Sequence, residues 1–185
     1  MDQQTEALQA RTNAKLRYAK VHLDELAGLP MYSGTDFDRA HQESFLFHLF
    51  GTRDVFLMEL HHYYGLAPIE KLTPGNLHNA LNLKGIKSNE LSAIFTLDQD
   101  DNSWYKLVKD MRDQSMHNQG LSHAFFMGGQ DDGKVKLKNP TTGVLIDGHF
   151  IDEFQDAFEK MRNLIDTLRK SAVEYMVSNN SSKND

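Results

Sequence analysis

Apolar residues recur at alternating three- and four-residue steps over long stretches of this chain, a pattern typical of amphipathic helices. The clearest stripe predicts one long helix over residues 150–177, and a second predicts a helix over residues 3–27. A third helix is predicted over residues 36–64, where residues 45–60 are apolar on nearly every side. We therefore expect this third helix to be the most buried element of an up-and-down bundle.

Shorter elements are predicted between the long helices. Residues 66–85 contain two prolines and two glycines, which indicates a connector with one short helix at 76–83. Another short helix is predicted over residues 88–97, and a further helix begins after Ser103 or Asp101 as its N-cap and ends near residue 117. Six glycines and prolines between residues 120 and 143 exclude a long helix in that segment.

A small β-hairpin is predicted before the last helix. Residues 134–138 alternate lysine with apolar residues, and residues 144–146 are apolar after a turn at 139–143. The fold class is therefore all-α, an up-and-down helical bundle of four to five helices with a β-hairpin insertion at about 122–148. We expect one domain over residues 1–178 and a disordered polar tail over residues 179–185.

Composition narrows the functional classes. The 185 residues fit a single soluble domain, and the absence of cysteine excludes disulfides and thiolate chemistry, which suits a reducing cytoplasm. The N-terminus lacks the order of a signal peptide, and the densest apolar run, residues 45–50, is too short to span a membrane. Because the net charge is -6, contact with RNA would need a local basic patch.

The candidate chemistry lies near the end of the helix that precedes the hairpin, where Arg112 is followed by Asp113 and, five positions on, by His117. Asp113 and His117 are four residues apart, so they share a helical face and are expected to hydrogen-bond. Arg112 and His117 lie about 140° apart on an ideal helix. Fraying of the helix end, or a second copy across a two-fold axis, would bring them to one site, and the second solution predicts a homodimer.

This segment resembles the signature of the HEPN superfamily, in which an arginine, a polar residue and a histidine a few positions later lie near a helix end of a helical bundle. The resemblance implies a metal-independent endoribonuclease, acting as a homodimer in toxin–antitoxin, defence or RNA-processing systems, with RNA and an antitoxin or other protein as partners. It also implies that Arg112 binds the scissile phosphate and that His117 acts on the 2'-hydroxyl. Asp113 would orient or polarise these catalytic groups. Other members are non-catalytic, so a binding or assembly module is the alternative.

Several lysines are candidates for RNA binding because of their position in the sequence. Lysines near the motif and on the predicted strand are candidate RNA-binding residues, namely Lys109, Lys134, Lys136 and Lys138. Two other features compete with this interpretation: the arginine–histidine spacing recurs at Arg17 and His22, and an ordinary solvated face would also carry lysines.

The histidines of the helix predicted over residues 36–64 raise the question of a metal site. His41, His48 and the pair Glu59 and His62 lie on this helix, but a dimetal site would need a second Glu-x-x-His copy, so no metal or cofactor is expected. His48 is expected to be a hydrogen-bonded core histidine. Arg53 and Glu59 are expected to form an internal polar network or an interface.

Overall fold

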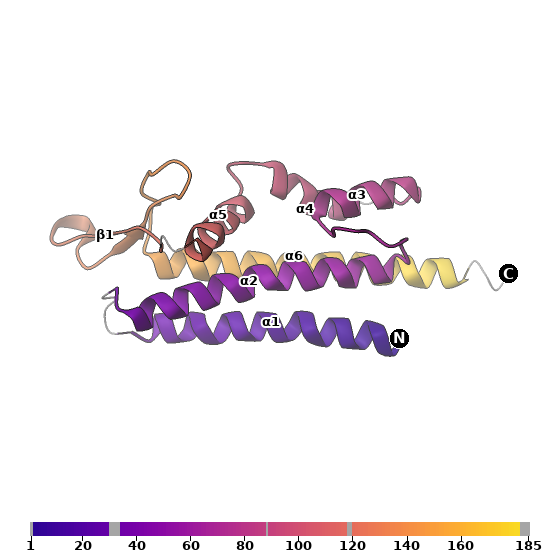
Figure 1. Ribbon diagram of the computed structural model, residues 1–185, viewed down its shortest axis with the longest axis horizontal. Coiled ribbons are helices and arrows are strands. Elements are labelled where there is room, and N and C mark those ends of the chain that lie inside the picture. The colour runs from indigo at the N-terminus through magenta and orange to yellow at the C-terminus, as the bar shows by residue number, and fades with distance from the viewer. Residues whose placement is uncertain (1, 30–33, 88, 118–119, 182–185) are drawn as a thin grey trace.

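The computed structural model describes residues 2–29, 34–87, 89–117 and 120–181, and within these ranges it has six α-helices and a two-stranded sheet. The long helices α1 (Gln3–Ala27), α2 (Asp36–Tyr63) and α6 (Phe150–Ser181) run side by side (Figure 1). Helices α3 (Pro74–Leu83), α4 (Asn89–Gln99) and α5 (Trp104–Met116) lie along one side of this frame. The hairpin is at one end of the molecule, and the start of α1 and the end of α6 are at the other (Figure 1).

The all-helical class with a hairpin before the last helix is confirmed. The six helices of the described ranges exceed the expected four to five, because both short segments between α2 and α5 form complete helices. Helix α6 continues to Ser181, beyond the expected end at residue 177, and residues 182–185 of the expected tail lie outside the described residues. No helix in the described ranges combines the length and apolarity that a membrane span requires.

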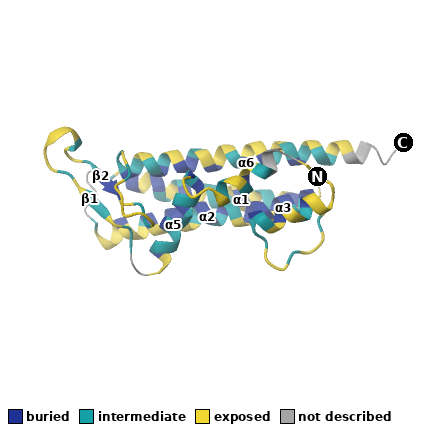
Figure 2. Cartoon of the chain, turned by 90° about the horizontal axis from the view of Figure 1, so that it is seen from above, coloured by how far each residue is buried: buried dark blue, intermediate teal, exposed yellow. Residues whose placement is uncertain are grey.

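Helix α2 forms the centre of the core, as its apolar run predicts. Thr35 caps it by accepting from the Asp38 backbone while the Asp38 carboxylate accepts from the Thr35 backbone, a reciprocal arrangement that satisfies two donors at the helix start. Its side chains that are at most 1% exposed include Phe45, Leu46, Leu49, Phe50, Phe56, Leu57 and Leu60. The stripe of α6 packs on this helix, and the rings of Phe45 and Phe154 lie 4.8 Å apart. Figure 2 shows that exposed residues follow the outer sides of the long helices.

The hairpin contains a strand that the sequence did not predict. Strand β1 (His123–Phe125) runs antiparallel to β2 (Val135–Leu137), with His123 opposite Leu137. The predicted partner, residues 144–146, also pairs with this segment, although over too few residues to form a strand. Leu145 bridges Lys138, and the backbone N–H of Ile146 donates to the carbonyl of Leu137 at 2.9 Å. The prediction missed β1 because residues 123–125 are too few to show a period.

A partly buried histidine joins this hairpin to the bundle. The Nε2 atom of His123 lies 2.9 Å from the Nε2 atom of Gln42 on α2, and its ring is 5.8 Å from the ring of Phe150 on α6. Burial lowers the pKa of His123 from 6.5 to about 4. The folded state therefore holds this imidazole neutral over a range in which the unfolded chain would protonate it.

Acid should therefore weaken the folded state through His123. Because folding lowers the pKa of His123, the neutral imidazole contributes its full stability at pH values above the unfolded pKa of 6.5. This contribution is lost as the pH falls towards the folded pKa of about 4. After allowance for the exposed part of the ring, we expect the loss to be about 2 kcal/mol. Urea denaturation at the two ends of this range should show a smaller loss in His123→Gln than in the wild type. Equal losses in both proteins would contradict the assignment.

A buried polar network surrounds Glu59 on α2, but Arg53, which was expected with it, has other partners. This side chain is 1% exposed and accepts two hydrogen bonds from Arg169 of α6, at 2.5 Å from Nε and 3.0 Å from Nη2. The hydroxyl of Thr12 on α1 donates to the same carboxylate at 2.9 Å. The network therefore ties together the three long helices through one buried charge.

Candidate functional site

The helix that carries the motif is positioned by one amphipathic face. The side chain of Ser103 caps α5 by accepting from the backbone of Lys106 at 3.0 Å. Tyr105, Val108 and Met111 lie on its buried face, which packs against α2. Arg112 follows the last of these and emerges at the edge of the packed face, with 26% of its side chain exposed.

The guanidinium of Arg112 lies over an aromatic ring of α2. Its central carbon is 4.7 Å from the centroid of Phe50, and its Nε donates to the carboxylate of Asp113 at 2.9 Å. Cation–π contact of this kind stabilises a cation by about 0.5–2 kcal/mol and limits its orientation. One planar face of the guanidinium is therefore held against protein, while part of the group remains accessible.

A second arginine reaches the same ring. The guanidinium carbon of Arg53 lies 4.4 Å from the Phe50 centroid, and Arg53 donates to Asp54 at 2.8 Å and to the hydroxyl of Tyr105 at 3.5 Å. Burial raises the pKa of Tyr105 to about 12, so the phenol remains neutral beside the cation. Phe50 is fully buried, with arginines of two different helices on it. The sequence signal for Arg53 was its position as a cation within the apolar run of α2.

His117 is at the end of α5 but outside its helical geometry. It is the C-cap, with φ -94° and ψ 26°, and its backbone N–H donates to the carbonyl of Gln114 at 3.2 Å. Its side chain is exposed. The expected hydrogen bond to Asp113 is not formed, because the carboxylate accepts from Arg112 and His117 has left the helical face that the two residues would share.

Two buried polar atoms of the same segment lack hydrogen-bond partners. They are Oε1 of Gln114 and Oγ of Ser115, and no other buried side-chain atom among the described residues is in this state. An unsatisfied buried polar group costs about 1–3 kcal/mol. The segment between Arg112 and His117 is therefore the least satisfied part of the described interior.

The candidate RNA-binding lysines are dispersed and mostly ion-paired. Lys109 lies 3.4 Å from Asp98, while Lys134 and Lys136 both reach Asp131, at 2.7 Å and 2.8 Å. The shared partner agrees with the predicted common strand face, although Lys136 is buried against Phe126 rather than solvated. Lys138 is exposed. The carboxylates offset much of the local positive charge that an RNA patch would need.

Histidines gather instead on the seam between α1 and α2. The Nδ1 atoms of His22 and His41 are 3.2 Å apart, and the ring of His48 stacks on that of His22 at 5.6 Å. His48 was expected in the core, but it is half-buried on this seam, where Nζ of Lys15 lies 3.5 Å from its Nδ1. Burial and then repulsion from His41 lower the pKa of His22, and burial followed by Lys15 lowers that of His48.

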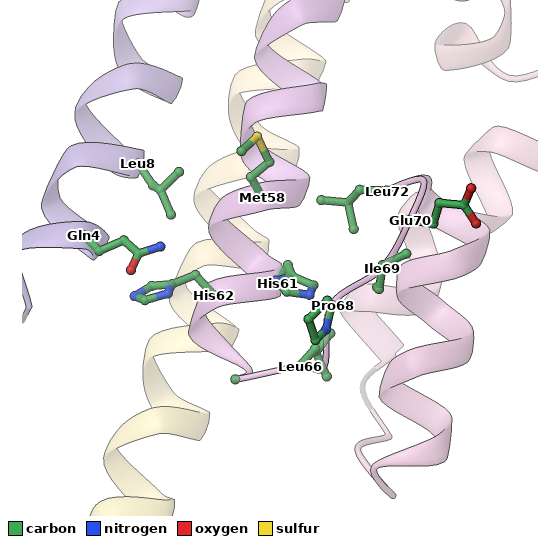
Figure 3. A pocket seen from close by; sticks show the side chains of 11 residues that line it. Gln4, Leu8, Met58, His61, His62, Leu66, Pro68, Ile69, Glu70 and Leu72 are labelled. Carbon is green, nitrogen blue, oxygen red and sulfur yellow. The ribbon is translucent and has the colours of Figure 1, made fainter.

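Two hollows of similar size contain none of the residues of the motif. One, of about 510 Å³, lies between the start of α1, the end of α2 and the connector after it, and includes His61, His62 and Glu70 (Figure 3). His61 donates to the carbonyl of Ala67 at 2.9 Å, and His62 lies 3.3 Å from the carboxylate of Asp2. The other, of about 520 Å³, includes Trp104 and Lys160.

The arrangement around α5 offers an oriented cation, a second cation in contact with the same ring and an exposed imidazole at the helix end. These groups suit the binding of a phosphate and the transfer of a proton. Comparison with known proteins adds no assignment, because no family model, curated protein or solved structure matches this chain.

Proposed function

We propose that this protein is a metal-independent endoribonuclease that acts as a homodimer, with Arg112 and His117 at its catalytic site. The proposal combines the resemblance of the segment to the HEPN signature with the groups that surround it. Arg112 is held against Phe50 while 26% of its side chain stays exposed, and the imidazole of His117 is exposed at the end of the same helix. RNA would be the substrate in a toxin–antitoxin, defence or RNA-processing role.

The chemistry requires only these side chains. His117 takes the proton of a ribose 2'-hydroxyl, and the resulting oxygen attacks the adjacent phosphorus. The bond from phosphorus to the 5'-oxygen breaks, which leaves a 2',3'-cyclic phosphate and a 5'-hydroxyl end that takes up a proton. Arg112 binds the non-bridging oxygens and stabilises the charge that builds on them. Asp113 orients Arg112 through the hydrogen bond at 2.9 Å.

The observation that most favours this segment is the pair of unpartnered polar atoms at Gln114 and Ser115. Buried polar groups are normally hydrogen-bonded, so these two atoms can gain partners when another molecule binds. A functional segment that rearranges slightly on contact with a second copy, or with RNA, would provide these atoms with partners. A two-fold contact of this kind would also place an Arg112 and a His117 from different protomers at one site.

The test is cleavage of single-stranded RNA by purified protein in the presence of a chelator. We expect products that end in a 2',3'-cyclic phosphate, and we expect His117→Ala to lower the rate by about 10²–10⁴-fold. His78→Ala is the matched control, because His78 of α3 stacks on Phe95 of α4, away from the motif in the sequence. This variant should cleave RNA as the wild type does. Cleavage that persists in His117→Ala would refute the assignment. Wild-type protein that binds RNA or a protein partner without cleaving RNA would favour the non-catalytic binding module.

A further inference from the structure

The histidine pair on the seam between α1 and α2 has a geometry that the proposed ribonuclease does not use. His22 projects from α1 and His41 from α2, and their Nδ1 atoms approach to 3.2 Å. Both side chains are half-buried, so neither is sealed in the core. Two imidazole nitrogens at this separation either share a proton or share a metal ion.

The separation matches that of two ligands on one metal ion. Zinc binds imidazole nitrogen at about 2.0–2.1 Å with tetrahedral angles, which places two such nitrogens about 3.3 Å apart. The observed 3.2 Å is close to this value. The two nitrogens are therefore already at the separation that one ion requires.

We propose that His22 and His41 bind a divalent transition-metal ion of the zinc class. Imidazole is a preferred ligand of zinc, nickel and copper. Among the described residues no group of three or more histidine, cysteine, aspartate or glutamate side chains is arranged for a metal, so water completes the coordination. We expect a one-to-one complex with micromolar rather than nanomolar affinity.

Neighbouring rings hold the two ligands in place. The ring of Phe37 lies 4.3 Å from that of His41, and the ring of His48 stacks on His22 with an angle of 6° between the planes. Fixed ligand rings reduce the entropy lost on metal binding. His48 itself is a poor ligand for the same ion, because its Nδ1 faces the ammonium of Lys15 at 3.5 Å.

Charge near the pair also favours a cation. Glu25 follows His22 by one turn of α1, and its carboxylate acts electrostatically on that imidazole. Glu25 is exposed and lies outside the pair, so it would attract the ion rather than position it. Glu25→Gln should therefore weaken binding less than the loss of either histidine.

Calorimetric titration of protein without a histidine tag with zinc chloride tests the proposal. We expect one ion per chain for the wild type and for His78→Ala, and a loss of at least about tenfold in affinity for His22→Ala and for His41→Ala. Because His22 and His41 are half-buried, thermal unfolding of each variant checks that it folds. As an independent readout, cobalt absorption should show the bands of nitrogen ligation in the wild type and lose them in the double variant.

The outcomes are separate from those of the ribonuclease proposal. Absence of zinc binding by the wild type would overturn the metal site, and so would equal affinity in the wild type and the folded double variant. In that case the 3.2 Å contact is a shared proton. RNA cleavage in chelator neither supports nor weakens the metal site, because His22 and His41 lie on helices other than α5.

Discussion

Glu59→Gln should lower the free energy of unfolding by about 3 kcal/mol, the low end of the range for breaking a buried ion pair. The carboxylate is 1% exposed and is bound by Arg169 at 2.5 Å and 3.0 Å and by Thr12 at 2.9 Å. The amide keeps the shape but loses the charge and turns one acceptor into a donor that faces Arg169. The guanidinium, 18% exposed, is then left without its counter-charge. Chemical denaturation of both proteins measures the difference.

Two controls separate the buried pair from carboxylates in general. Asp24→Asn makes the same chemical change in an exposed pair with Lys20, whose side chains are 41% and 60% exposed, and should alter stability by less than about 1 kcal/mol. The double change Glu59→Leu with Arg169→Leu removes both charges and should be less destabilising than Glu59→Gln. If Glu59→Gln and Asp24→Asn had equal effects, the buried network would have no special role in stability.

Arg112→Ala should lower the turnover of RNA cleavage by about 10²–10³-fold, the effect of removing one donor that stabilises transition-state charge. Arg112→Lys should recover only part of this loss, because a point charge cannot bind a phosphate through two parallel hydrogen bonds or lie flat on Phe50. Single-turnover cleavage at saturating protein measures the chemical step directly. A wild-type rate in Arg112→Ala would contradict the proposed role.

The control variant for Arg112→Ala must change the net charge of the protein by the same amount. Arg162 on α6 is 51% exposed, and Arg162→Ala removes the same charge from another surface, so it should cleave RNA as the wild type does. Because Arg112 also covers Phe50, thermal unfolding of Arg112→Ala and Arg112→Lys shows whether a loss of activity accompanies a loss of structure. A loss of rate with an unchanged melting temperature assigns the effect to chemistry.

Sequence periodicity predicted the long helices closely and the hairpin only in part. Helix α1 matches the predicted residues 3–27, and α2 ends at Tyr63, one residue before the predicted end. The apolar faces of these helices are long, so many residues follow the same helical period. Each strand of the hairpin has three residues, and its partner is chosen by how the segments pack on the bundle, as His123 does against Gln42.

The site shows the same division. The sequence alone identified Arg112, Asp113 and His117 and placed them at a helix end, because local pattern and capping determine where a helix stops. Only the tertiary structure brought Arg53 to the ring that Arg112 contacts, Arg169 to Glu59, and His22 to His41. Such pairs depend on how each helix is rotated and shifted against its neighbour. That choice is made by the summed packing of the whole core, and no local stretch of sequence records it.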